Sequence, residues 1–325
     1  MSTEQLAVSV RGRSVFVPAA SIGGVTVVVT GTFPRIASVA DEYWTENAMP
    51  KEPLAFVAQI SSGPLRADLV TFAQEIDQHE PEHSFRFEWD NVAAIETADF
   101  DRWWASLPQA TRKNCRRSER RGAQTGVVPL DEELARGIKR IYDESPIRQG
   151  RRFWHYGKDL EAVWRENATY ADRSVFIATR VDGELIGFMK IVFVGRFAKI
   201  MQILSAAAHA DKRPMNALIA KAVEVCSQRG ASHLIYGKFQ YGNGTANSLL
   251  EFKTRNGFVR LDYPRYFVPV TRRGKLALAC RLHRPLIEIL PAPVLDTLVQ
   301  VRESAMRLLW RERNTQDNHA GADAA

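Results

Sequence analysis

Residues 175–192 read VFIATRVDGELIGFMKIV and carry the clearest structural signal in the chain. Two runs rich in β-branched, aromatic and other apolar residues flank the dipeptide Asp182-Gly183. Such residues favour strands, and Asp-Gly favours the type I′ turn that connects two antiparallel strands. The stretch therefore predicts a β-hairpin with strands at 175–181 and 184–192. A third strand at about 198–205 would complete a meander.

Helices and strands surround this hairpin on both sides. The elements predicted around it are, in chain order, helices at 131–142 and 157–167, a helix at 217–228 that Gly230 ends, a strand at 233–238, a helix at 245–255 that Asn256-Gly257 closes, and a strand at 261–270. From residue 130 the order is helix, helix, three strands, helix, strand, helix, strand. We therefore expect an α/β fold with a mixed sheet.

The first hundred residues predict a smaller α+β unit. The β-branched run at 24–30 and the alternating run at 84–89 predict strands. The runs at 54–60 and 67–76 have apolar residues at mixed spacings of three and four, which favours helices.

Composition narrows the class of protein. The chain has 325 residues, a net charge of +7 and three cysteines, which are far apart. This cysteine usage favours a reducing compartment, and no pattern of cysteines or histidines predicts a metal site. The sequence shows neither a signal peptide nor an apolar run of the ~18 residues that a spanning helix needs. We expect a cytoplasmic protein with an anionic partner: a phosphate-bearing cofactor, tRNA or an anionic lipid surface.

A basic run lies between the two regions. A helix over 112–121 would gather on one side the residues Arg112, Lys113, Arg116, Arg117, Arg120 and Arg121, before Gly122 ends it. Solvated charge is the usual explanation of such a run, and the alternative is a surface for tRNA, a nucleotide-bearing donor or lipid. The run itself contains no aromatic residue that could stack on a base.

Three motifs, in this order, resemble the FemAB-like group of the GNAT acyltransferase superfamily. They are the basic helix Arg112-x3-Arg116-Arg117-x4-Gly122, the turn Ile141–Arg148, and the segment LEFKTRNGF at 250–258, which is similar to the group's L-x-F-K-x-x-x-G. The resemblance covers 100–270 and implies a GNAT-like fold. The expected layout is a degenerate GNAT half at 1–99, a basic linking helix at 100–126, a complete GNAT domain at 127–275, C-terminal amphipathic helices at 276–313 and a disordered tail at 314–325.

The stretch before the predicted helix at 217–228 is the expected donor site. Members that bind acetyl-CoA carry R/Q-x-x-G-x-G/A here, whereas residues 211–217 read DKRPMNA and lack glycine. A proline suits the first turn of a helix, and a helix N-terminus flanked by bases suits a phosphate. The expected cofactor contacts are Lys212, Arg213, Met215, Asn216 and Ala217, and the resemblance adds Lys253. The alternatives are an ordinary helix capped by Asp211 and solvent-facing lysines.

Acyl transfer requires a deprotonated amine, a polarised carbonyl and a proton donor for the leaving group. The candidates for this acid–base work are Glu144, His155, His209 and Tyr236, all of which could instead serve packing. Arg148, Arg151 and Tyr156 could hold an anionic part of the acceptor, although the arginines could equally form surface ion pairs.

These features predict an N-acyltransferase that moves an acyl group from acyl-CoA to an amine of a small molecule or amino sugar, without a metal. The first alternative is an aminoacyl-tRNA-dependent transferase that acts on a cell-envelope precursor, as the FemAB-like resemblance implies. The second is a GNAT-like protein that binds a partner without catalysis.

Overall fold

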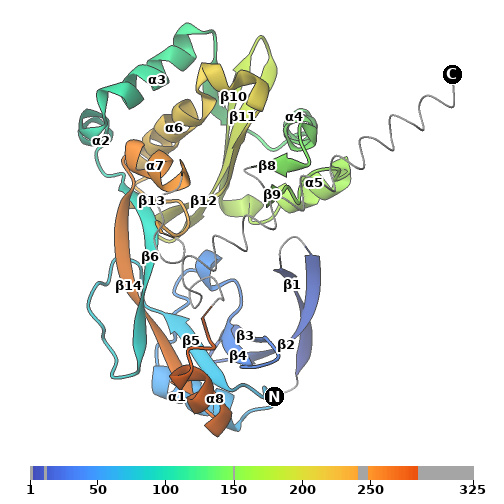
Figure 1. Cartoon of the computed structure of the whole chain (residues 1–325), viewed down its shortest axis with the longest axis vertical. Helices are drawn as coiled ribbons and strands as arrows, with labels where there is room; N and C mark the ends of the chain where they lie inside the picture. Colours follow the sequence, from blue (N-terminus) through green and yellow to red (C-terminus); the bar gives the residue numbers. More distant parts are fainter. Residues whose placement is uncertain (1–2, 11–12, 149–150, 241–247, 285–325) are drawn as a thin grey trace, which may run out of the picture.

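The computed structural model describes residues 3–10, 13–148, 151–240 and 248–284. Within them, twelve strands form one mixed sheet that runs through the whole molecule (Figure 1), in the order β1-β2-β3-β4-β5-β14-β6-β13-β12-β11-β10-β7. The α/β fold with a large mixed sheet, predicted from the sequence, is confirmed. A short hairpin, β8 (Ile147–Arg148) and β9 (Arg151–Arg152), lies outside this sheet.

The second half of the chain forms around the predicted hairpin. Its strands are β7 (Gln124–Val128), β10 (Ser174–Val181), β11 (Glu184–Val194), β12 (Phe197–Ser205) and β13 (His233–Ile235). Asp182 and Gly183 both have positive φ, as the type I′ turn requires.

Alternation along these strands creates two apolar faces. On one face, Ile177 and Met189 pack with residues of α6 (Pro214–Gln228). On the other, Phe176 and Phe188 pack with α4 (Glu132–Asp143) and α5 (Leu160–Asn167). Because successive side chains of a strand point to opposite faces, the sheet is buried on both sides.

The first half contributes the other end of the sheet. Its strands are β1 (Glu4–Val10), β2 (Arg13–Ile22), β3 (Val25–Thr30), β4 (Ile36–Val39), β5 (Leu69–Ala73) and β6 (Phe87–Glu96), and α1 (Pro53–Ser62) and the 3₁₀ helix η1 (Glu42–Trp44) belong to the same half. The long strand β14 (Val259–Pro269) pairs with β6 and with β5 and thereby joins the halves.

One predicted element in this half was wrong. Residues 67–76 were expected to be helical, but they contain the strand β5. Its residues Leu69, Val70 and Phe72 are completely buried. A strand buried on both faces has a nearly continuous apolar run, so its spacing does not distinguish it from a helix.

Two helices connect the halves. They are α2 (Phe100–Ser106) and α3 (Gln109–Arg120), which contains most of the predicted basic run. Thr111, Cys115 and Ser118 form the buried side of α3, which packs against α6. The basic residues therefore lie on the outer side, as the sequence predicted.

The last described elements are α7 (Ser248–Arg255) and α8 (Arg272–Ala279). The predicted amphipathic helix near 294–310 and the tail at 314–325 lie outside the described residues, and the proposed domain boundaries stay a prediction. Of the helices described, none has the length and apolar character to cross a membrane. The same residues contain no group of three side chains that could hold a metal ion.

Candidate active site

The most distinctive feature of the sheet is the separation of two parallel neighbours, β12 and β13. They pair only from Phe197 with His233 to Lys199 with Ile235, although β12 continues to Ser205. Beyond Ile235 the chain follows β6 instead: the Tyr236 amide donates to the Ala93 carbonyl at 2.8 Å. In the described part of the chain, residues 200–205 therefore have no partner strand on that side.

A β-bulge lies in this separated part of β12. In the pairing with β11, Lys190 faces Gln202 and Ile191 faces Ile200, so Met201 is an extra residue. A bulge bends its strand and changes the direction of the side chains. Next to it, the side chain of Gln202 accepts a hydrogen bond from the Tyr142 hydroxyl at 2.7 Å.

Two of the predicted residues, Tyr236 and Lys253, meet beside the end of β13. Lys253 lies on α7 and is only 1% exposed, so it is not the solvent-facing lysine that was the alternative. Its Nζ donates to the Lys238 carbonyl at 2.5 Å and lies 4.7 Å from the centre of the Tyr236 ring. Burial lowers the pKa of Lys253 to about 8, because a buried ammonium loses its hydration.

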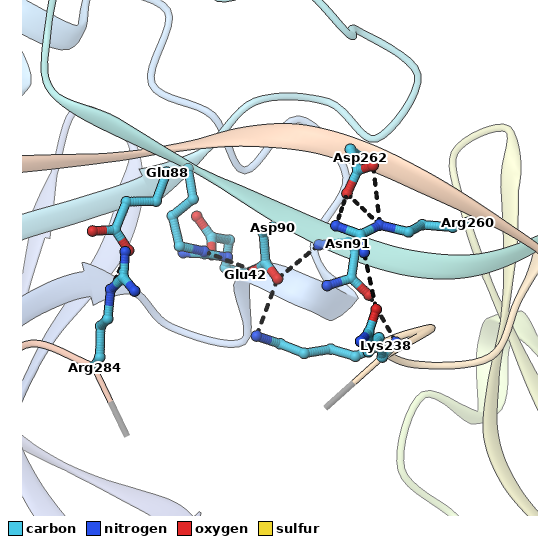
Figure 2. A network of polar contacts seen from close by, with 10 residues as sticks. Glu42, Glu88, Asp90, Asn91, Lys238, Arg260, Asp262 and Arg284 are labelled. Carbon is cyan, nitrogen blue, oxygen red and sulfur yellow. Dashed lines mark hydrogen bonds and ion pairs between the residues drawn. The ribbon is translucent and has the colours of Figure 1, made fainter. Parts of the chain in front are cut away.

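A polar network fixes the segment that holds Lys253 (Figure 2). The Lys238 ammonium lies 3.1 Å from Asp90, and the other oxygen of Asp90 accepts from Arg265 Nε at 3.2 Å. Burial alone would raise the pKa of Asp90, but these two cations hold it below its ordinary value. Arg265 also donates to Glu42 at 2.8 Å. The network thus ties the Lys238 segment to both β6 and β14, and to η1 in the first half.

The N-terminus of α6 contains the other predicted donor contacts. Arg213 adopts a left-handed conformation with φ of 55°, and Pro214 begins the helix. No described side chain caps this end. Arg213 is exposed, whereas Lys212 lies 3.1 Å from His209 Nδ1.

The remaining three donor candidates follow directly in α6. Met215 packs against the core, Ala217 is buried, and the Asn216 amide donates to Asn256 Oδ1 at 2.9 Å. Asn216 therefore connects the start of α6 to the end of α7, which carries Lys253. The six-residue 3₁₀ helix η3 (Ala207–Lys212) occupies the place of the expected loop.

Two predicted residues hold the end of β12. Both carboxylate oxygens of Glu144 accept from the Ala207 amide, at 2.8 and 3.0 Å. Arg148 donates to the Ser205 carbonyl at 3.1 Å and to Glu144 at 3.1 Å. In this structure both side chains therefore position the connection between β12 and α6.

His155 lies in a buried cluster next to the bulge. Its Nε2 is 3.1 Å from Gln202 Nε2, and its Nδ1 is 3.4 Å from Glu166. Burial, reinforced by the charges of Lys158 and Arg148, lowers its pKa to about 3. His155 is therefore neutral at physiological pH, and its Nε2 can accept a hydrogen bond from the Gln202 amide.

The structure does not bring all predicted residues together. His209 lies on η3, 3.8 Å from Glu184 at the hairpin turn. Tyr156 is 47% exposed, and the side chain of Arg151 lies outside the description. Gln202 and Asn256 were not among the predicted site residues. The position of Asn256 inside the segment LEFKTRNGF was the one sequence signal for it, and Gln202 had none.

Comparisons with known proteins support the fold. No family model matches the sequence, and no curated protein matches it significantly. Among solved structures, FemX is 10% identical over 86% of this chain and 90% of its own, with a TM-score of 0.52. The C-terminal domain (DUF2156) of a putative lysylphosphatidylglycerol synthetase from Agrobacterium fabrum is 14% identical over 81% and 87%, with a TM-score of 0.53. L-PGS from Bacillus licheniformis is 16% identical over 82% and 88%, with a TM-score of 0.51.

At these identities the similarity shows the fold alone. It confirms the expected fold, which this chain shares with these three structures over most of its length.

Proposed function

We propose that this chain is an acyltransferase whose reaction takes place where β12 and β13 separate. Three observations together carry the proposal: the unpaired side of β12, the bulge at Met201, and the contact beyond the end of β13 between the buried Lys253 and the partly buried Tyr236. Backbone N–H groups and a buried cation can stabilise negative charge on a carbonyl oxygen. The fold that this chain shares with FemX is consistent with this chemistry.

In the proposed reaction, an acceptor amine attacks the acyl carbon of the donor. The carbonyl electrons move to oxygen, where the β12 amides and the Lys253 ammonium stabilise the oxyanion. When the carbonyl re-forms, the bond to the donor breaks. In this scheme Tyr236 gives a proton to the leaving oxygen or sulfur and regains one from the nitrogen that attacked.

We favour an aminoacyl-tRNA as the donor. The loop before α6 has no glycine and folds as η3, so the usual cradle for the pyrophosphate of CoA has little support here. The exposed bases of α3 suit a polyanion. Similar structures include a putative lysylphosphatidylglycerol synthetase, whose name describes the transfer of an aminoacyl group.

Acyl-CoA remains the second candidate, favoured by the uncapped N-terminus of α6 beside Arg213. The acceptor is then an amine of a small molecule or an amino sugar, or of a cell-envelope precursor if the donor is tRNA.

The test measures binding of donors that cannot react. The purified chain is titrated with an RNA minihelix bearing a 3′-aminoacyl amide, with the same minihelix without the aminoacyl group, and with CoA and acetyl-CoA. We expect the aminoacylated RNA to bind at least about tenfold more tightly than the bare RNA, and Lys253→Met to remove this preference. The matched control is Lys275→Met, which replaces an exposed lysine of α8.

If CoA or acetyl-CoA stabilises the chain and neither RNA binds, the donor is acyl-CoA rather than an aminoacyl-tRNA. Thermal unfolding detects such binding, because a ligand at ~100 Kd adds ~2.7 kcal/mol to the free energy of unfolding. Equal binding of both RNAs, with no response to CoA or acetyl-CoA, would contradict acyl transfer and favour a non-catalytic role.

A further inference from the structure

A cavity of about 400 Å³ lies between α2, α3 and α6, and neither Lys253 nor Tyr236 lines it. Its walls are formed by Phe100 and Trp104 of α2 and by Arg116 of α3. Ala217 and Ala220 of α6 also line it, and their small side chains leave space between the helices. The volume is in the range of sites for small organic groups.

The aromatic wall is arranged for stacking. The Phe100 and Trp104 rings are nearly parallel, with 16° between their planes and 6.1 Å between their centres. Both side chains are only partly buried. The Arg116 guanidinium lies 5.9 Å from the centre of the Trp104 ring. Planar aromatic and guanidinium groups are the surfaces on which unpaired bases stack.

The cavity opens beside a basic surface. Lys113, Arg116 and Arg117 are exposed on α3 and form no ion pair with any residue that the structure describes. At the end of the same helix, Arg121 pairs with Asp211 of η3, directly before α6. Arg121 thereby connects the end of the basic helix to the segment directly before α6.

Polar groups on the rim can recognise the edge of a base. Glu119 and Thr125 line the cavity and offer hydrogen-bond acceptors, and Lys221 is held by Glu224 at 3.0 Å. A flat lipid surface would not reach into such a cavity, because its aromatic wall lies between α2, α3 and α6.

We propose that this cavity binds an unpaired base of an RNA, with the base against Trp104 and the neighbouring phosphates on Lys113, Arg116 and Arg117. The identification of that RNA as the donor tRNA rests on the proposed function, but the site itself does not require acyl transfer. In this site the stacking residues come from α2, and the basic run of α3 itself contains no aromatic residue.

The experiment compares two single strands of equal charge, an octamer of adenosine and an abasic octamer, by fluorescence anisotropy. We expect the wild-type chain to bind the adenosine strand about tenfold more tightly, which is the size of one stacking contact. Trp104→Ala should abolish this preference and leave binding of the abasic strand unchanged. Trp104→Phe should retain most of it, and Trp164→Ala, at an exposed tryptophan of α5, should have no effect.

Arg116→Gln tests the site without removing an aromatic ring. This substitution should weaken the binding of both strands and reduce the dependence of that binding on salt. Equal binding of the two strands by the wild type, an unchanged preference in Trp104→Ala, or binding to phosphatidylglycerol vesicles but not to RNA would each overturn the proposal. None of these strands carries an acyl group. The result therefore does not depend on whether the chain catalyses the proposed acyl transfer.

Discussion

At the scale of single residues, Lys253 is the side chain whose environment differs most from expectation. A lysine that is 1% exposed has given up most of its hydration, which is unfavourable for the charged form. In place of water, its Nζ donates to the Lys238 carbonyl and lies against the Tyr236 ring. Such a group is poised to change its charge near neutral pH, which is a common property of functional lysines.

The lowered pKa of Lys253 predicts a pH dependence of stability. Between its folded pKa of about 8 and the ordinary value of 10.5, the folded chain has lost a proton that the unfolded chain still holds. The free energy of unfolding therefore rises with pH in this window. From pH 8 to pH 10 we expect Lys253 to contribute a rise of about 2–3 kcal/mol.

Urea unfolding at the two pH values measures the total rise, which Lys253→Met should reduce by this amount. The remaining rise comes from Lys190 and Lys199, because burial also lowers the pKa of each to about 8. Lys275→Met, at an exposed position of α8, should keep the wild-type dependence. A rise in Lys253→Met as large as that of the wild type would show that burial does not perturb the pKa of Lys253.

At the scale of elements, the end of α7 is held in place by close packing. Gly257 has φ of 83°, and a Cβ added to it would lie 2.7 Å from Trp103 Nε1 and 3.1 Å from Leu107. Trp103 Nε1 in turn donates to the Asn256 carbonyl at 3.3 Å. The glycine therefore lets α2 contact the helix that carries Lys253.

Gly257→Ala should lower stability by about 2–4 kcal/mol, because left-handed strain and a steric clash act together. The matched control is Gly230→Ala after α6: φ is 70° there, but no atom lies within 4 Å of the added Cβ. The control should cost only the strain, about 1–2 kcal/mol. Thermal unfolding of both variants measures the difference, and equal losses would mean that the contact with α2 is not tight.

At the scale of the whole molecule, the two halves are joined by more than a shared strand. Arg173 of the second half donates to the Trp44 carbonyl at 2.7 Å, and the Tyr170 hydroxyl donates to Asp41 at 3.0 Å. The Lys199 ammonium donates to the Tyr43 carbonyl. These contacts and β14 both act on the segment around η1, where Glu42 also anchors the network of Figure 2.

We therefore expect the halves to unfold in one cooperative transition. Tryptophan fluorescence and far-ultraviolet circular dichroism, followed during urea unfolding, should give the same midpoint. Two separated transitions would show that β14 and the contacts of η1 do not couple the halves.

The sequence by itself determined the local elements of the second half and their order. The Asp182-Gly183 turn, the periodic helices α4 and α6 and the F-K segment depend on interactions between neighbours in the chain, which propensity and spacing report. The place of Tyr236 on a predicted strand made it a candidate, and the resemblance to the FemAB-like group added Lys253. Spacing failed for β5, because burial on both faces removes the periodic signal.

Only the tertiary structure decided how these elements cooperate. The separation of β12 from β13, the burial of Lys253 and the placement of Trp104 beside Arg116 all depend on contacts between distant segments. Glu144 and Arg148 hold the connection between β12 and α6 through partners that lie about sixty residues away in the sequence. Local spacing carries no information about such contacts, because long-range packing sets them.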